Sequence, residues 1–168
     1  MPRRRSPEKR KILPDPKYKD IIVAKNISSS AKAKEVDVYN ISNQDMGLDI
    51  GTKTIKEFLD VLQKAKLVIW NGPLGAFEYE KFSNGTKLIA EEIKTLTIKG
   101  SLKSIIGGGD TASAIMNLKL ENYFTHVSTG GGASLELLSG KNIKLKENFK
   151  KDWYEKILYC KLENELNY

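Results

Sequence analysis

Residues 103–111 read KSIIGGGDT, a short apolar run that stops at three glycines and is followed by residues typical of a helix start. Two further stretches repeat this order: LVIW then NGPLG (residues 67–75), with a helical pattern at 86–95, and HV then STGGG (residues 126–132), with one at 133–138. A short buried strand, a glycine turn and a helix, repeated along a chain, predict a parallel sheet covered by helices. We therefore expect an α/β domain.

The glycine turns mark the place where a ligand would bind. Eight of the 13 glycines lie in the three turns, and ligands of parallel sheets bind beyond the carboxyl ends of the strands. Glycine lets the backbone approach a ligand closely, and the free N–H groups of a helix start attract anions. The turn Gly107-Gly108-Gly109 with Asp110 and Thr111 fits a phosphate site. The same turn is explained equally well if Asp110 acts only as the N-cap of a helix and binds no ligand.

An acid beside phosphate groups would repel them unless a cation lies between. If the turn binds phosphate, Asp110 therefore faces Mg²⁺, a hard ion that takes carboxylate and phosphate oxygens. The turn Gly130-Gly131-Gly132 is a second triple glycine after an apolar run, and Asn71-Gly72-Pro73 is a third irregular segment in the same position. An extended ligand, with phosphates at one end and a nucleoside at the other, would span these turns.

Other familiar sites fit less well. There is no G-x-x-x-x-G-K-[ST] loop, and with one histidine and one cysteine the chain lacks the parts of a zinc site or a Ser/His/Asp triad. We expect His126 to be a packed strand residue. Residues 107–112 match the dinucleotide fingerprint, but that motif requires an acid at the end of the next strand, where Ser128 and Thr129 stand.

The first part of the sequence contains weaker signals. An apolar run at 20–25 predicts a strand, the Ser- and Lys-rich stretch 26–34 a loop, and the alternation at 35–39 a half-exposed strand. A helix is expected at 53–65, with Thr54 and Glu57 as a capping box.

The net charge of +7 is concentrated at the two ends of the chain. Residues 1–11 carry a net +5 and residues 141–168 a net +2, whereas residues 12–140 are neutral. A nucleic-acid-binding domain would carry its basic residues on the folded face, so we expect a basic disordered lead-in at 1–11 and no nucleic-acid partner. No apolar run approaches the length of a membrane span. The single cysteine and the absence of a signal-peptide pattern favour the cytoplasm.

Four stretches, in this order, resemble the phosphoglycerate kinase family closely. They are GLDIG (residues 47–51), WNGPLGAFE (70–78), GGGDT (107–111) and STGGGASLE (128–136). The likeness covers about residues 12–140. It implies a Rossmann-like, three-layer α/β domain, the C-terminal nucleotide-binding domain of that family. It also implies binding of MgADP or MgATP and phosphoryl transfer between 1,3-bisphosphoglycerate and ADP.

The resemblance implies a role for each matching residue. Asn71, Gly72 and Pro73 would line the nucleoside, and Glu78 would bond the ribose hydroxyls. Gly107, Gly108 and Gly109 would approach the phosphates, Asp110 would hold Mg²⁺, and Thr111 would contact a phosphate oxygen. Gly130, Gly131 and Gly132 would face the transferring phosphoryl group, where backbone N–H donors stabilise negative charge.

The departures from the family predict an incomplete kinase. Its N-terminal domain, with the 3-phosphoglycerate site and a catalytic arginine, and the opening of its C-terminal domain have no counterpart here. Thr52 stands where the family has proline. We expect residues 141–168 to be a divergent, amphipathic helical tail that packs on the domain or on a partner, and both ends to be foreign sequence. A separate N-terminal half would have to complete the enzyme, or the chain is a non-catalytic nucleotide-binding remnant.

Overall fold

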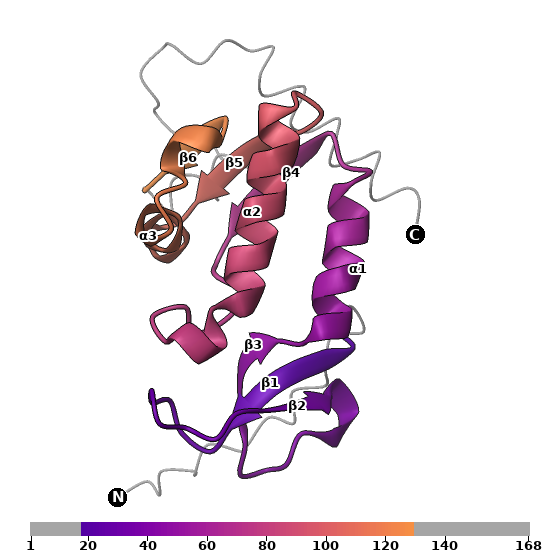
Figure 1. The fold of residues 1–168 in the computed structure, drawn as a ribbon, viewed down its shortest axis with the longest axis vertical. Coiled ribbons are helices and arrows are strands. Elements are labelled where there is room, and N and C mark those ends of the chain that lie inside the picture. Colours follow the sequence, from indigo (N-terminus) through magenta and orange to yellow (C-terminus); the bar gives the residue numbers. More distant parts are fainter. Residues whose placement is uncertain (1–17, 130–168) are drawn as a thin grey trace, which may run out of the picture.

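A computed structural model describes residues 18–129, which form two three-stranded sheets and a layer of helices (Figure 1). The antiparallel sheet has the order β2-β1-β3, with β1 at Asp20–Ala24, β2 at Lys34–Asp37 and β3 at Met46–Ile50. The parallel sheet has the order β4-β5-β6, with β4 at Leu67–Asn71, β5 at Lys103–Gly107 and β6 at His126–Ser128. The predicted α/β fold with a parallel sheet is confirmed.

Three α-helices connect the strands. They are α1 at Thr52–Leu62, α2 at Asn84–Ile98 and α3 at Gly109–Asn117. Short 3₁₀ turns lie at Val38–Asn40 (η1), Glu80–Phe82 (η2) and Glu121–Tyr123 (η3). Two long helices were expected at 53–65 and 86–95, and α1 and α2 confirm them. Three of the four helix ends lie two or three residues from the expected positions.

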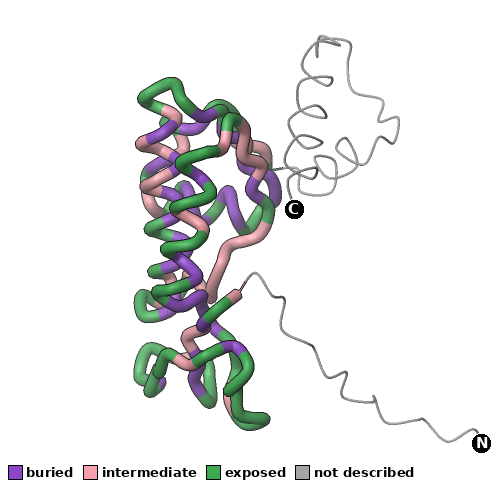
Figure 2. The backbone as a smooth tube through the Cα atoms, turned by 90° about the vertical axis from the view of Figure 1, so that its right-hand side faces the viewer, coloured by how far each residue is buried: buried purple, intermediate pink, exposed green. Residues whose placement is uncertain are grey.

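The main hydrophobic core lies between the helices and one face of the parallel sheet. Trp70 and Ile106 are paired on β4 and β5, and both belong to the same buried cluster as Leu62 of α1, Ile93 of α2 and Ile115 of α3. All three helices therefore pack on the same face of that sheet. Burying one such aliphatic side chain contributes about 1.5–3 kcal/mol. Figure 2 shows buried segments alternating with exposed ones along the helices.

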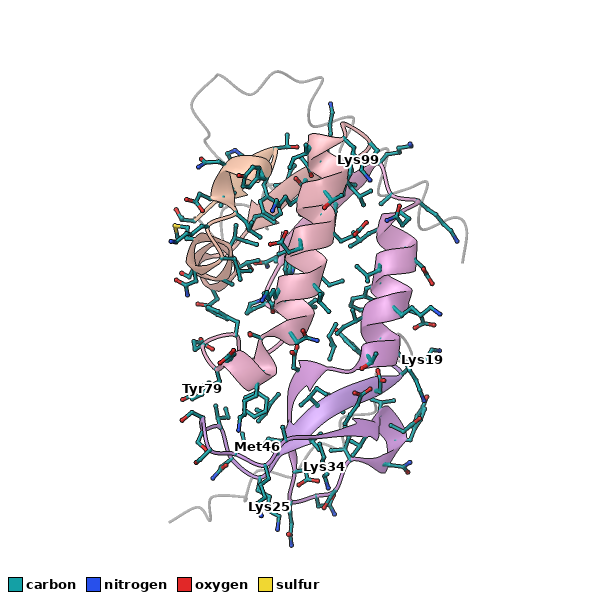
Figure 3. All side chains as sticks on the ribbon, viewed as in Figure 1. Lys19, Lys25, Lys34, Met46, Tyr79 and Lys99 are labelled. Carbon is teal, nitrogen blue, oxygen red and sulfur yellow. The ribbon has the colours of Figure 1, made fainter. Side chains whose placement is uncertain are left out.

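A buried carboxylate joins the antiparallel sheet to α1. Asp20 of β1 is 3% exposed and accepts hydrogen bonds from the N–H groups of Lys53 and Thr54, each at 2.9 Å, and from the Thr54 hydroxyl at 2.8 Å. The expected capping box is therefore wrong: Gly51 is the N-cap, and Thr54 binds Asp20. Glu57 instead pairs with Lys19, at the base of α1 (Figure 3), at 3.6 Å. A carboxylate from a neighbouring strand has replaced the local cap.

A second carboxylate joins the same sheet to α2. Asp49 of β3 is 2% exposed and accepts the N–H of Gly85, in the first turn of α2, at 2.9 Å. Its other oxygen accepts the N–H of Ile50 at 2.9 Å. The N-terminal ends of both long helices thus face the antiparallel sheet, as Figure 1 shows, and each end receives one negative charge, which suits the helix dipole.

Three further expectations differ from the structure. Met46–Ile50 is a strand that was not expected: Met46, Leu48 and Ile50 alternate with Gly47 and Asp49, but the stretch is only five residues long. The strand expected at 35–39 ends at Asp37, whose side chain caps η1. His126 lies in a strand as expected, but it is exposed rather than packed; its strand is the outer one of the sheet that residues 18–129 form.

Some expectations fall on parts of the chain that the structure does not describe. The lead-in at 1–11, the helix at 133–138 and the tail at 141–168 lie outside residues 18–129. Within the described range, no helix has the length and apolarity to cross a bilayer.

The Asp20 carboxylate gives a prediction on stability against pH. Burial alone would raise the pKa of Asp20, but the hydrogen bonds from Lys53 and Thr54 outweigh it and hold the pKa below the ordinary value. Because the folded-state pKa is depressed, the stabilisation is present above the unfolded pKa of about 4 and is lost as pH falls through the folded value. Asp20→Asn should lower the unfolding free energy by about 1–3 kcal/mol at pH 7, and by less at pH 3.

Urea unfolding at the two pH values measures this difference. Asp37→Asn is the matched control, because Asp37 is exposed and caps only η1 through Tyr39; its effect should stay below about 1 kcal/mol. An Asp20→Asn effect that equals the control, or that is the same at both pH values, would contradict the role given to this carboxylate.

Candidate functional site

The carboxyl ends of the three parallel strands lie level with one another. Asn71, the last residue of β4, pairs with Gly107, the last residue of β5. Gly107 in turn pairs with Ser128, the last residue of β6. This register brings the carboxyl ends of the three strands to one edge of the sheet, as the three sequence repeats predicted.

The loops after β4 and β5 are in direct contact at this edge. The N–H of Gly72 donates to the hydroxyl oxygen of Thr111, on α3, at 2.6 Å. A Cβ atom placed on Gly108 would collide with the side-chain oxygen of Asn71. The indole N–H of Trp70 donates to the carbonyl of Gly72 at 2.6 Å and thus fixes the following peptide group as well. The segments around residues 72 and 108 therefore form one surface.

The triple glycine divides between three structural roles. Gly107 ends β5, Gly108 is the N-cap of α3, and Gly109 is the first residue of that helix. Gly108 has φ of 95° and ψ of 141°, a region that only glycine adopts without strain. Space around Gly109 is open with respect to residues 18–129, since a Cβ atom there would meet none of their atoms within 4 Å. The backbone of this turn is therefore accessible on one side.

Asp110 lies in the first turn of α3 and is exposed. The plain alternative, an aspartate that caps its own helix, is wrong, because Gly108 occupies the N-cap position and α3 has no side-chain cap hydrogen bond. The carboxylate makes no hydrogen bond or ion pair with residues 18–129. It stands at the open backbone of Gly109, where a cation could bind it together with an anion on the N–H groups of α3.

Thr111 is fully buried, at 0% exposure, and its hydroxyl oxygen accepts from Gly72. This is a different arrangement from the expected one, in which the hydroxyl faces a phosphate. In this structure Thr111 joins the loop after β4 to the start of α3. Contact with a phosphate stays a prediction.

The segment from Pro73 to Glu78 leaves the edge and runs toward the antiparallel sheet. Its N–H groups at Leu74 and Ala76 donate to the Thr86 hydroxyl, at 3.0 Å, and to the Leu48 carbonyl, at 2.8 Å. Glu78 is exposed and makes no hydrogen bond or ion pair within the described range. Figure 3 shows its neighbour Tyr79 beside η2, toward the antiparallel sheet.

Sequence reasoning did not single out two residues of this edge. Trp70 was assigned to the buried strand alone, and Thr86 only to the start of a helical pattern. Both act on the backbone of the loop after β4, and a hydroxyl that binds a distant N–H leaves no periodic signal in a sequence. Gly130, Gly131 and Gly132 lie outside the described residues, directly after Ser128 and Thr129.

The metal-binding groups at this edge suit a magnesium ion that is also bound by the phosphate oxygens of a ligand. Among residues 18–129 no group of three or more histidine, cysteine or acidic side chains could hold a metal ion by itself. Magnesium is commonly held by one or two carboxylates together with phosphate oxygens and water. The single free carboxylate of Asp110 fits that pattern.

The two glycines at the start of α3 give a matched stability prediction. Gly108→Ala should lower the unfolding free energy by about 1–3 kcal/mol, since alanine is strained at a φ of 95° and its methyl group would meet Asn71. Gly109→Ala, one residue on, has open space and should be neutral or slightly stabilising. Urea unfolding of both variants measures this, and equal effects would show that the turn is not built as described.

The chain matches known proteins over most of its length. The model of the family described as "Phosphoglycerate kinase" matches residues 5–141. A phosphoglycerate kinase of Rhodococcus opacus is 50% identical over 125 residues, which cover 74% of this chain and 31% of that protein. One from the Onion yellows phytoplasma is 49% identical over 137 residues, which cover 81% of this chain and 33% of that protein. The chain thus spans about a third of the length of these relatives.

Solved structures agree with the sequence matches. The structure is similar to phosphoglycerate kinase from Coxiella burnetii with a TM-score of 0.69 and 37% identity, over 74% of this chain and 31% of that one. With the enzyme from Pyrococcus horikoshii OT3 the TM-score is 0.62 at 27% identity, over 87% of this chain and 33% of that one. The family match, the relatives with about 50% sequence identity and the shared fold together show that this chain belongs to the phosphoglycerate kinase family.

Proposed function

We propose that this chain carries the C-terminal, nucleotide-binding part of a phosphoglycerate kinase and binds MgADP and MgATP. The observation that carries the proposal is the joined edge of the parallel sheet, where Gly72 and Gly108 lie side by side through Thr111 and Asn71. An adenine nucleotide has the shape for such an edge, with a nucleoside at one end and charged phosphates at the other. The cytoplasm, where glycolysis runs, is the proposed setting.

The loop after β4 would receive the nucleoside. Asn71 is exposed at the tip of β4, and Gly72 and Pro73 continue its surface half-buried. Glu78 is exposed and has no partner among the described residues, which leaves its carboxylate free to accept hydrogen bonds from ribose hydroxyls. A short acceptor with two oxygens suits neighbouring hydroxyl groups.

The start of α3 would receive the phosphates. The first N–H groups of a helix have no intrahelical partner and carry the positive end of its dipole. Gly108 and Gly109 carry no side chains of their own, and the open space at Gly109 lets a phosphate come close to these groups. Asp110 would hold the magnesium ion that neutralises part of the phosphate charge.

The reaction proposed for the completed enzyme is phosphoryl transfer between 1,3-bisphosphoglycerate and ADP. In this family-based proposal the backbone N–H groups of Gly130, Gly131 and Gly132 stabilise the transferring phosphoryl group. Residues 12–140 contain no arginine, so the strong bidentate phosphate contacts that arginine makes would come from elsewhere. We propose that a separate N-terminal half supplies them together with the 3-phosphoglycerate site.

Calorimetry with MgADP tests the nucleotide site. The full chain should bind MgADP, and Asp110→Ala should weaken binding about tenfold, a change of about 1.4 kcal/mol. Gly109→Ala should also weaken binding, because its methyl group enters the space of the phosphate while it leaves the fold intact.

Asp60→Ala is the control, since Asp60 is an exposed acid on α1, and it should bind like the unaltered chain. Equal affinity in all four proteins would contradict this site. Binding of NADH in preference to MgADP would favour a dinucleotide-binding domain instead.

A coupled assay with 3-phosphoglycerate and MgATP tests autonomous activity. Phosphoryl transfer depends on holding both substrates in line, so the chain alone should give no turnover above background at millimolar substrates. Clear turnover by the chain alone would refute the need for a second half. MgADP binding without turnover, unchanged by any added N-terminal domain of the family, would favour a non-catalytic nucleotide-binding remnant.

A further inference from the structure

The loop after β4 is held at three alternate peptide groups by three different elements. Gly72 N–H donates to Thr111 on α3 at 2.6 Å, Leu74 N–H to Thr86 on α2 at 3.0 Å, and Ala76 N–H to the Leu48 carbonyl of β3 at 2.8 Å. No two of these acceptors belong to the same helix or strand. The loop is therefore fixed to both helices that begin near it and to the antiparallel sheet.

The two threonines occupy equivalent places. Thr86 is the third residue of α2, and Thr111 is the third residue of α3. Both are buried, at 1% and 0% exposure, so their hydroxyl groups are removed from water, and the hydrogen bonds that they accept from the half-buried Gly72 and Leu74 are partly shielded from solvent. A buried N–H that loses its acceptor costs more than an exposed one.

From this arrangement we infer that Thr86 is a positioning residue of the nucleotide site, which fixes Leu74 and thereby the nucleoside-binding face of Asn71-Gly72-Pro73 before any ligand binds. The inference rests on the proposed function of this edge. Thr86 is buried under the loop, at 1% exposure, so a nucleotide on the outer face of the loop would not contact it. Its effect on binding is indirect, since a loop that is already ordered loses less conformational entropy when the nucleotide arrives.

If Thr86 only stabilised α2, replacing another hydrogen-bonded threonine of α2 should affect the loop and MgADP binding equally. α2 is a long helix, and threonines elsewhere on it also make hydrogen bonds, as Thr95 does to the Glu91 carbonyl at 2.9 Å. That bond stays within α2. Replacing Thr95 by valine makes the same chemical change on the same helix without touching the loop, so it provides a matched control.

Amide hydrogen exchange and MgADP calorimetry on the full chain test the inference. Thr86→Val keeps the shape of the side chain but leaves the Leu74 N–H without its acceptor. In the nucleotide-free protein the Leu74 amide should exchange at least about tenfold faster than in Thr95→Val, and the Kd for MgADP should rise about three- to tenfold. Thr86→Ser, which keeps the hydroxyl, should restore both values.

Each outcome decides the inference. Unchanged Leu74 exchange in Thr86→Val, a Kd equal to that of Thr95→Val, or no rescue by serine would overturn it. If Thr86→Val does not fold, Thr86→Ala measured against Thr86→Ser gives the same comparison. Failure of the unaltered chain to bind MgADP would overturn the proposed function and the positioning role with it, whereas normal binding by the variants would overturn the positioning role alone.

Discussion

The carboxylate of Asp49 lies buried at the point where β3, α2 and the segment after β4 meet, and the geometry of the site depends on it. Its two oxygens accept N–H groups from Ile50 and Gly85, and a Cβ atom at Gly75 would lie 2.5 Å from one of them. Burial raises the pKa of Asp49, and the hydrogen bonds from Gly85, Ile50 and Asn84 lower it only in part. A buried carboxylate tolerates this only while its donors stay aligned. The start of α2 and the loop beside Gly75 are therefore held in one position.

Asp20 is a second buried carboxylate of this kind, and it accepts N–H groups from the first turn of α1. Each of the two strands that carry a buried aspartate, β1 and β3, thus binds the first turn of a long helix whose buried residues contribute to the main core. The small antiparallel sheet has little core of its own, consisting of a cluster with Ala24, Leu48 and Phe82. Hydrogen bonds to charged groups are stronger than neutral ones, so the two carboxylates at the junction stabilise the arrangement more than neutral acceptors would. The result is a rigid frame behind the strand tips.

The frame explains why the sheet edge needs so few side chains to form a surface. The register of β4, β5 and β6 aligns their ends, and the contacts of Gly72 and Gly108 join two of the loops. What lies on that surface is mostly backbone, with Asn71 and Asp110 as exposed polar side chains. Preorganised N–H groups at a helix start bind an anion without reorganisation. A polyphosphate site requires two properties. One is rigid support, which the two buried carboxylates provide here, and the other is open backbone, which the turn at the start of α3 provides.

Much of this could be predicted from the sequence because it has a periodic or compositional signal. The repeat of apolar run, glycine turn and helix located β4, β5 and β6, and the glycines located the edge between them. The buried network could not be predicted, because Asp20 and Thr54 are 34 residues apart and each looks like an ordinary surface residue in its own neighbourhood. A local capping box at Thr54 satisfied the pattern and was wrong. β3 was also missed, because a five-residue stretch is too short a signal to identify as a strand without its pairing to β1.

The central claim is that the tips of β4 and β5 form a single site for a magnesium-bearing nucleotide. An NMR titration of the full chain with MgADP, following the backbone amides of Gly72, Gly108 and Gly109 together, tests it most directly. One bound nucleotide predicts that the three signals shift with the same apparent Kd and that magnesium chelation reverses the shifts in parallel. Signals that move at different ligand concentrations, or a response confined to one of the two loops, would contradict a shared site.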